Sequence, residues 1–245
     1  MIDLKKITRG IVLFTFDDGW TDQWLDCIPL FQEFNAHATF FYPGSLPEKD
    51  LNGIKLLQKA GHSVGLHALN HLNADEFVSE HGGTAYLEAE IFPQLNALKK
   101  AGINVENFAY PNNRRNEATD RVLLPYFKKF RADLPSKPEK GYDISAQPDA
   151  FLTMKEAGET SLYCGNGIGE YYLSTFENLE KALKKAAEEN LRLTFFSHGI
   201  SEEPNQISMN KTLLRKCLQT ASDLGMQIAG FDDLPCARII TDQKT

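Results

Sequence analysis

The chain has 245 residues, of which 42% are hydrophobic, 24% charged and 11% aromatic, a composition that excludes a disordered or fibrous protein. Its 26 basic and 33 acidic side chains leave a net charge of −7, and no lysine or arginine block could neutralise phosphates, which disfavours nucleic acid as a partner. A chain of this length buries enough surface to fold without disulfides or a structural metal. Any metal would therefore serve function.

Cysteine usage and the first residues bear on location. The four cysteines form no C-x-x-C pair, so we expect free and mostly buried thiols. Residues 1–10 are polar and basic where a signal peptide is apolar, and the apolar runs have the length of strands. The sequence as written predicts a cytoplasmic protein with no membrane span, whereas a secreted or periplasmic protein would need a leader. The oligomeric state stays open.

Strand-length apolar runs alternate with helical periodicity from one end of the chain to the other. The strand candidates are residues 11–16, 38–42, 63–67, 105–110, 130–133, 192–197 and 226–231. This alternation, with no break in composition, predicts a parallel sheet covered by helices. We expect one α/β domain over residues 1–245, a distorted (β/α)7 barrel.

Three helices are clearest between these strands. The first is marked by Leu87, Ile91, Leu95 and Leu98, with a kink at Pro93, and the other two cover residues 177–190 and 211–224. A Ser174/Glu177 capping box precedes the second helix, and Gly225 ends the third. Residues 134–172 hold three prolines and a glycine cluster, which predicts irregular structure with short strands that carries substrate contacts.

Titratable residues follow four of the seven predicted strands. Asp17 and Asp18 end the first, His67 and His71 follow the third, Tyr110-Pro111 ends the fourth and His198 ends the sixth. In parallel α/β barrels the active site lies at the carboxyl ends of the strands. These groups are therefore expected to meet on one face.

The spacing of the two histidines predicts a metal site. On a helical turn, His67 and His71 would share one side and could bind one ion, with a carboxylate completing three ligands and leaving open positions. Asp17 and Asp18 point in different directions, so one could bind metal while the other faces a water. Each signal has an ordinary alternative: Asp-Gly is a common turn, the histidine pair can lie on a solvated helix, and His198 can be a core residue.

Several segments, in order from about residue 11 to about 234, resemble the polysaccharide deacetylase family, also called the NodB-homology domain or carbohydrate esterase family 4. The matching segments are L-F-T-F-D-D-G (13–19), A-T-F-F (38–41), G-H-S-V-G-L-H (61–67) with His71, F-A-Y-P (108–111) and F-S-H (196–198). The resemblance implies a metal-dependent hydrolase of non-peptide C–N bonds that removes acetyl groups, foremost N-acetyl from a poly- or oligosaccharide containing N-acetylglucosamine.

The resemblance also implies a role for each matched residue. Asp18, His67 and His71 would bind one divalent metal, foremost Zn²⁺, with Co²⁺, Ni²⁺ or Fe²⁺ as alternatives. Asp17 would be the general base and His198 the general acid, while the backbone N–H of Tyr110 would help to hold the oxyanion. The side chains expected to contact the saccharide are Trp20, Pro111, Asn112 and Phe196.

The chain departs from the family pattern on the substrate side. Ala68 stands where the family has a hydroxyl residue and Ala109 where it has an arginine, so an arginine partner of Asp17 is either missing or comes from elsewhere, with Arg114, Arg115 and Arg131 as candidates. Asn112 and Asn113 stand where the family has an aromatic residue and a glycine, and the family's later tryptophan has no counterpart. An acidic partner for His198 would come from Asp133, Asp143 or Asp149.

The altered third motif and the lost supporting side chains leave other functions open. The alternatives are hydrolysis of another ester or amide, such as O-acetyl xylan or a small cyclic amide, a saccharide-binding module without turnover, and a metal-stabilised structural domain. Tyrosines 163, 171 and 172 could stack on a sugar, but core packing is the favoured interpretation.

Overall fold

Seven parallel strands close into a barrel in the computed structural model, which describes residues 1–205 and 207–237. The ring follows the order β1-β2-β3-β4-β5-β7-β8, and β8 pairs with β1 to close it. Its strands are β1 (Ile11–Phe16), β2 (Thr39–Tyr42), β3 (Ser63–Leu66), β4 (Asn107–Ala109), β5 (Lys129–Asp133), β7 (Leu162–Gly167) and β8 (Leu191–Ser197). The predicted (β/α)7 barrel is confirmed. Of the predicted range 1–245, residues 206 and 238–245 lie outside the described part.

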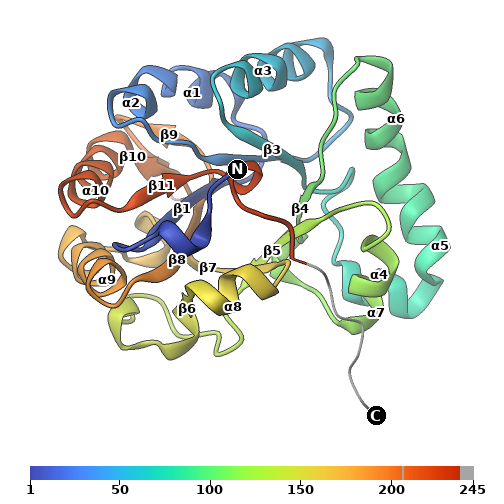
Figure 1. Cartoon of the computed structure of the whole chain (residues 1–245). Helices are drawn as coiled ribbons and strands as arrows, with labels where there is room; N and C mark the ends of the chain where they lie inside the picture. Colours follow the sequence, from blue (N-terminus) through green and yellow to red (C-terminus); the bar gives the residue numbers. More distant parts are fainter. Residues whose placement is uncertain (206, 238–245) are drawn as a thin grey trace.

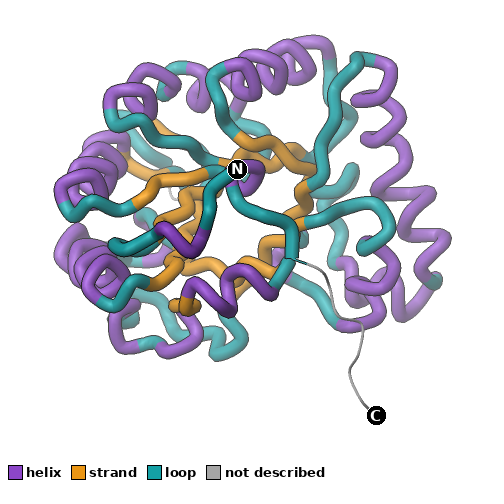
Figure 2. Tube along the Cα trace, viewed as in Figure 1, coloured by secondary structure: helices purple, strands orange, loops and turns teal. Residues whose placement is uncertain are grey.

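Helices form an outer layer around the strands (Figures 1 and 2). They are α1 (Thr21–Leu25), α2 (Ile28–Glu33), α3 (Glu48–Lys59), α4 (Ala74–His81), α5 (Gly83–Tyr86), α6 (Phe92–Lys100), α7 (Glu117–Leu123), α8 (Met154–Glu159), α9 (Phe176–Glu188) and α10 (Lys211–Asp223). Within the described residues, none of these helices has the length and apolar character needed to cross a membrane.

The three helices expected from periodicity are present with small differences at their ends. In α9, the apolar face from Leu179 to Ala187 is buried, but the N-cap is Thr175 and not Ser174: its side chain accepts a hydrogen bond from the N–H of Asn178. Asn210 caps α10 in the same way. Pro93 lies in the first turn of α6, directly after a π-helical turn (Leu87–Ile91) that joins α5 to α6.

The strand predicted over residues 226–231 is present but shorter, and the sequence missed another strand of the ring. Residues 226–231 form only the short β11 (Gln227–Ala229), which pairs with the first half of β1, while β2 pairs with its second half. β7 takes the seventh place in the ring, from a segment expected to be irregular. Glycines hide this strand in the sequence, yet packing requires them: a Cβ at Gly165 would lie 3.0 Å from the Phe196 ring, and one at Gly167 would overlap the Tyr172 ring.

Three further short strands lie outside the ring. β6 (Phe151–Thr153) pairs antiparallel with the first residues of β8, and β9 (Ile200–Ser201) pairs with β10 (Met209–Asn210) in a separate two-stranded sheet. The segment between β5 and β7 thus carries β6, the six-residue α8 and two 3-10 turns in place of one long crossover helix.

The side chains of β1 alternate between two separate hydrophobic clusters. Val12, Phe14 and Phe16 pack in the large cluster between barrel and helices, whereas Ile11 and Leu13 pack in a smaller cluster with residues such as Phe41 and Tyr163. Successive side chains of a strand point to opposite faces. Asp17, two residues beyond Thr15, therefore continues the row that points into the barrel.

Candidate active site

The end of β1 turns the two neighbouring aspartates in different directions. The N–H of Asp17 still bonds to the carbonyl of Ser197 (2.9 Å), so Asp17 continues the sheet and its side chain is buried. Asp18 has a φ of 74°, in the left-handed region that L-residues rarely adopt. This backbone turn points the Asp18 carboxylate toward the loop after β3 and gives the two carboxylates separate surroundings, as expected from their spacing.

The two histidines meet on an irregular loop and not on the helical turn that their spacing suggested. The N–H of His67 bonds to the carbonyl of Tyr42 (2.8 Å) and extends β3, after which Ala68 (φ 61°) and His71 (φ 57°) bend the chain. Non-glycine residues held in this region cost about 1–3 kcal/mol each and persist only where the surroundings enforce them. Strain at Asp18, Ala68 and His71 thus concentrates at this site.

Glu90, which the sequence did not single out, holds that loop. Its carboxylate accepts hydrogen bonds from the N–H (2.8 Å) and side-chain amide (2.7 Å) of Asn70, and its carbonyl accepts one from the N–H of Leu69 (3.0 Å). Glu90 is fully buried and lies in the π-helical turn. A glutamate on the apolar stripe of a predicted helix was the available signal. Glu90 thus fixes the backbone of the loop that carries His71.

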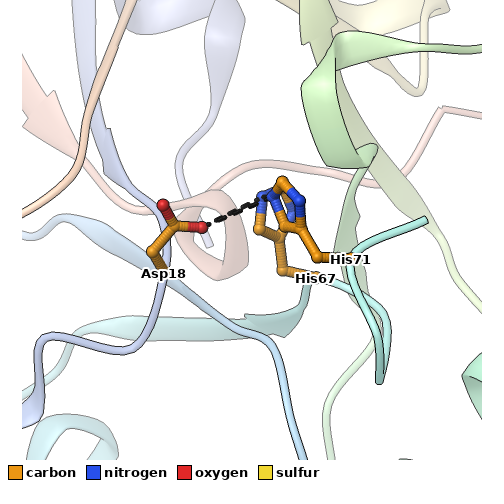
Figure 3. Close-up of side chains that lie close together, drawn as sticks. All are labelled: Asp18, His67 and His71. Carbon is orange, nitrogen blue, oxygen red and sulfur yellow. Dashed lines mark hydrogen bonds and ion pairs between the residues drawn. The ribbon is translucent and has the colours of Figure 1, made fainter. Parts of the chain in front are cut away.

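Asp18, His67 and His71, which we call the donor triad, present three ligand atoms to one point (Figure 3), all within 4.8 Å of one another. The Nε2 atoms of the two histidines are 3.2 Å apart. Oδ1 of Asp18 lies 3.6 Å from Nε2 of His67 and 3.5 Å from Nε2 of His71. Donors about 2.0–2.2 Å from one ion have separations of this size. The sequence-predicted ligands are thus brought together.

The protonation of His67 also suits a ligand. Its Nδ1 lies 2.8 Å from the carbonyl oxygen of Ala109, which accepts a hydrogen bond from Nδ1–H. The lone pair of Nε2 therefore faces the other donors. Burial lowers the pKa of His67 to about 4, although the nearby Asp17 carboxylate acts in the opposite direction. The imidazole is therefore neutral, as a metal ligand must be.

Asp17 pairs with Arg131, which settles the choice among the three arginines. Asp17 and Arg131 are 3% and 1% exposed, and the guanidinium contacts the Asp17 carboxylate and the side chain of Asn113. Burial acts to raise the pKa of Asp17, but the Arg131 guanidinium, helped by His67 and His198, outweighs burial and lowers it. Arg114 instead pairs with Asp75 and Glu76, and Arg115 with Asp120.

His198 follows β8 and faces the donor triad from the opposite side. Its Nε2 lies 3.7 Å from Oδ2 of Asp18, and its Nδ1 lies 3.1 Å from the carbonyl of Ile207. None of the three acidic candidates contacts His198 in the described residues: Asp133, Asp143 and Asp149 instead accept hydrogen bonds from the N–H groups of Leu134, Ser145 and Ser136 respectively. A backbone carbonyl takes the place of a carboxylate beside His198.

Tyr110 cannot supply the expected oxyanion contact. Its N–H donates to the carbonyl of Arg131 (3.1 Å) in the ladder between β4 and β5, and its buried hydroxyl donates to Asp120 (2.7 Å). Pro111 has no N–H. The N–H of Asn112 has no hydrogen-bond partner among the described residues, and Asn112 (φ 51°) lines the cavity at the site. Asn112 therefore offers an N–H at this cavity, two residues later than expected.

A cavity of about 450 Å³ contains the donor triad, Asp17 and His198. Of the predicted saccharide contacts, Asn112 and Phe196 line it, whereas Trp20 and Pro111 do not: Pro111 is buried, and Trp20 lies against Gly199. Trp20 and Pro111 lie close in sequence to the site residues, but this closeness does not place their side chains in the cavity.

The three tyrosines also differ. Tyr163 is buried inside the barrel, as favoured from the sequence, but Tyr171 and Tyr172 line the cavity. Core packing was therefore the wrong interpretation for these two residues. They lie in the 3-10 turn Glu170–Tyr172, between β7 and α9, and no periodic pattern marks such a turn.

The chain is similar to polysaccharide deacetylases. The family model described as polysaccharide deacetylase matches residues 5–126. A peptidoglycan-N-acetylglucosamine deacetylase from Bacillus cereus is 38% identical over 74 residues, which are 29% of this chain and 33% of that protein. The chain spans 20–41% of the length of the curated relatives it matches.

Two solved structures extend the likeness over most of the chain. A peptidoglycan deacetylase from Bacillus subtilis has a TM-score of 0.57 at 16% identity and covers 95% of this chain and 91% of its own. A wild-type pseudoenzyme of carbohydrate esterase family 4 from Bacillus anthracis has a TM-score of 0.62 at 12% identity, over 93% of this chain and 66% of its own. At these identities the likeness shows the fold.

Proposed function

Because the chain belongs to the polysaccharide deacetylase family, we propose that it is a metal-dependent hydrolase that removes N-acetyl groups from poly- or oligosaccharides containing N-acetylglucosamine. The observation that carries this proposal is the donor triad, which lies with Asp17 and His198 in one cavity. The activity named for the Bacillus cereus relative supports the choice of N-acetylglucosamine. In this proposal, residues 1–245 act as one catalytic domain.

The donor triad fits a divalent metal ion. One carboxylate and two neutral imidazoles are a common catalytic zinc set, with Co²⁺, Ni²⁺ and Fe²⁺ as further candidates for the same donors. The hydrogen bond from His67 to Ala109 orients one ligand, and the contacts of Glu90 with Asn70 and Leu69 hold the loop of the other. When bound, such an ion polarises the acetyl carbonyl and lowers the pKa of water from 15.7 toward ~7.

Asp17 and His198 divide the two proton transfers of amide hydrolysis. Arg131 keeps Asp17 ionised, so Asp17 can accept a proton from the attacking water while the water oxygen bonds to the acetyl carbon. His198, on the other side of Asp18, donates a proton to the nitrogen as the C–N bond breaks. Acetate and a free amine are the products.

The N–H of Asn112 provides the donor for the developing oxyanion. A preorganised N–H of this kind contributes roughly 3–4 kcal/mol to lowering the barrier. The left-handed conformations of Asn112 (φ 51°) and Asn113 (φ 55°) and the hydrogen bond from the Asn112 side chain to Asn73 (2.9 Å) hold this short turn in place. Its direction is set by the backbone, so the asparagine side chain need not resemble the aromatic residue of the family.

The aromatic rings of Phe196 and Tyr172 form the apolar wall that the acetyl methyl requires. Their centroids are 5.3 Å apart at an interplanar angle of 77°, and both rings line the cavity. Tyr172 comes from the segment between β7 and α9 and fills the space left open by Gly167. Within the proposal, this ring replaces the missing family tryptophan.

Acetate release tests the proposal directly. Zinc-loaded protein should release acetate from tetra-N-acetylchitotetraose, and Asp17→Asn and His198→Ala should each lose most of this activity. Hydrolysis of O-acetyl xylan or a cyclic amide, without release from the N-acetylated substrate, would favour the alternative chemistry. Binding without any turnover would favour the inactive saccharide-binding module, which the fold of the Bacillus anthracis pseudoenzyme makes a concrete alternative.

A further inference from the structure

Tyr171 is the exposed aromatic ring of the cavity. It is 46% exposed, whereas the tyrosines of the barrel and its helices, at positions 42, 86, 110 and 163, are fully buried. It lines the same cavity as the donor triad and His198. Because burying an aromatic ring of this size is favourable, a ligand in the cavity would gain free energy by covering this one.

The ring of Tyr171 is held in place by the cavity wall. Its centroid is 5.0 Å from that of Tyr172, at an angle of 86°, and Tyr172 in turn packs against Phe196 at 77°. Gly167 leaves room for the Tyr172 ring, and Gly169 (φ +117°) allows the turn that presents both tyrosines. A ring fixed in advance loses little conformational entropy when a ligand stacks on it.

One face of Tyr171 is already occupied. The ammonium of Lys140 lies 3.1 Å from the ring centroid, a cation–π contact. Lys140 does not line the cavity, although Tyr171 does. With Lys140 on one face, Tyr171 is still 46% exposed, so part of its ring is open to a ligand.

The cavity also continues beyond the site. A second cavity of about 340 Å³ shares Asn113 and Asp133 with the first and extends past Arg115 and Lys137. A ligand longer than one sugar therefore has room away from Tyr171 as well as beside it. Hexopyranose rings present C–H groups on one face and hydroxyls at the edge, which suits an aromatic face flanked by polar side chains.

From these observations we infer that Tyr171 is the stacking platform for a second sugar ring, next to the sugar that carries the reacting acetamide, so that the substrate is an oligo- or polysaccharide and not a monosaccharide. This inference rests on the proposed function for the identity of the ligand. It assigns chain-length preference to the turn between β7 and α9, a role that the site motifs do not cover.

Binding of tetra-N-acetylchitotetraose and of N-acetylglucosamine to the zinc-loaded protein tests the platform. Tyr171→Ala should weaken binding of the tetramer roughly 2- to 10-fold and leave binding of the monosaccharide unchanged. Tyr171→Phe keeps the ring and should bind the tetramer as the wild type does. Tyr126→Ala is the matched control, because Tyr126 is also exposed (38%) but packs on Phe92 outside the cavity.

The outcomes separate the platform from the proposed function. Equal tetramer affinity in Tyr171→Ala and wild type, with acetate still released, overturns the platform and leaves the deacetylase. Tetramer binding that depends on Tyr171, without acetate release, supports the platform and overturns the deacetylase. If the wild type neither binds nor deacetylates the tetramer, both are wrong. A loss in Tyr171→Ala that Tyr171→Phe shares would overturn stacking, because the hydroxyl and not the ring would then be responsible.

Discussion

Arg131→Met should destabilise the protein strongly through Asp17. The substitution removes the cation that contacts Oδ2 of a carboxylate only 3% exposed, and Oδ1 of that carboxylate has no hydrogen-bond partner among the described residues. At an effective dielectric constant of about 20, two charges about 4 Å apart attract by roughly 4 kcal/mol. Breaking a buried pair by removing one partner typically costs about 3–5 kcal/mol. We expect a loss in this range at neutral pH.

The loss should depend on pH in a defined direction. In the folded wild type the pKa of Asp17 is lower than in the unfolded chain. The pair with Arg131 therefore stabilises the fold at any pH above the pKa of Asp17 in the unfolded chain, and this stability is lost as the pH falls through the pKa of Asp17 in the folded protein. Without Arg131, burial is opposed only by the histidines, and the pKa of Asp17 rises. The carboxyl then gains a proton on acidification and its burial becomes less costly. The stability gap between the variant and the wild type should therefore narrow from pH 7 to pH 5.

Urea unfolding of metal-free protein, followed by tryptophan fluorescence, measures this gap. The double variant Asp17→Asn/Arg131→Met removes both charges and should recover most of the loss. Arg114→Met is the matched control, because Arg114 is 43% exposed in its pairs with Asp75 and Glu76 and should cost less than about 1 kcal/mol. A loss below about 1 kcal/mol in Arg131→Met, or no recovery in the double variant, would refute the buried pair.

Three further predictions concern metal, the metal loop and acid stability. Elemental analysis should find about one divalent ion per chain, lost when any member of the donor triad becomes alanine; a chain that takes up none on reconstitution contradicts the site. Glu90→Ala should weaken zinc affinity about 10- to 100-fold in a chelator competition, whereas the exposed Glu88→Ala should not, and equal affinities would deny Glu90 its supporting role. Burial lowers the pKa of His62 to about 4 from 6.5, so below pH 6.5 the unfolded state binds a proton that the folded state does not. Unfolding free energy should fall by about 3 kcal/mol toward pH 4, and His62→Gln, which does not titrate, should remove this part of the slope.

The local sequence pattern was enough to predict the strands that carry the candidate site. The apolar run before Asp17 and Asp18 predicts β1, and the run before His67 predicts β3, because a strand is recognisable from a few consecutive residues. Parallel strands end at one edge, so these residues were expected to meet on one face, whereas the choice of Asp18, His67 and His71 as ligands came from the family resemblance. The barrel itself was predictable for the same reason, since alternating strands and helices permit few topologies.

Other features depend on residues that are distant in sequence. Arg131 lies on β5 and Asp17 follows β1, two strands that are not neighbours in the closed ring. They pair because both side chains point into the interior of the barrel. The N–H of Tyr110 is taken by the carbonyl of Arg131 because Ala109 and Arg131 are paired in the register of β4 and β5. Neither pairing leaves a mark in the local sequence.

The sequence by itself determined which residues could carry the chemistry, because strand periodicity and the order of polar residues at strand ends are local properties. Only the tertiary structure decided which N–H is free, which arginine meets Asp17, and that Tyr171 is exposed while Tyr163 is buried. It also gave the seventh place in the ring to the glycine-rich β7, since close packing against Phe196 and Tyr172 and not intrinsic propensity selects those glycines. Register and packing arise from pairs of segments, and one segment's residues do not specify them.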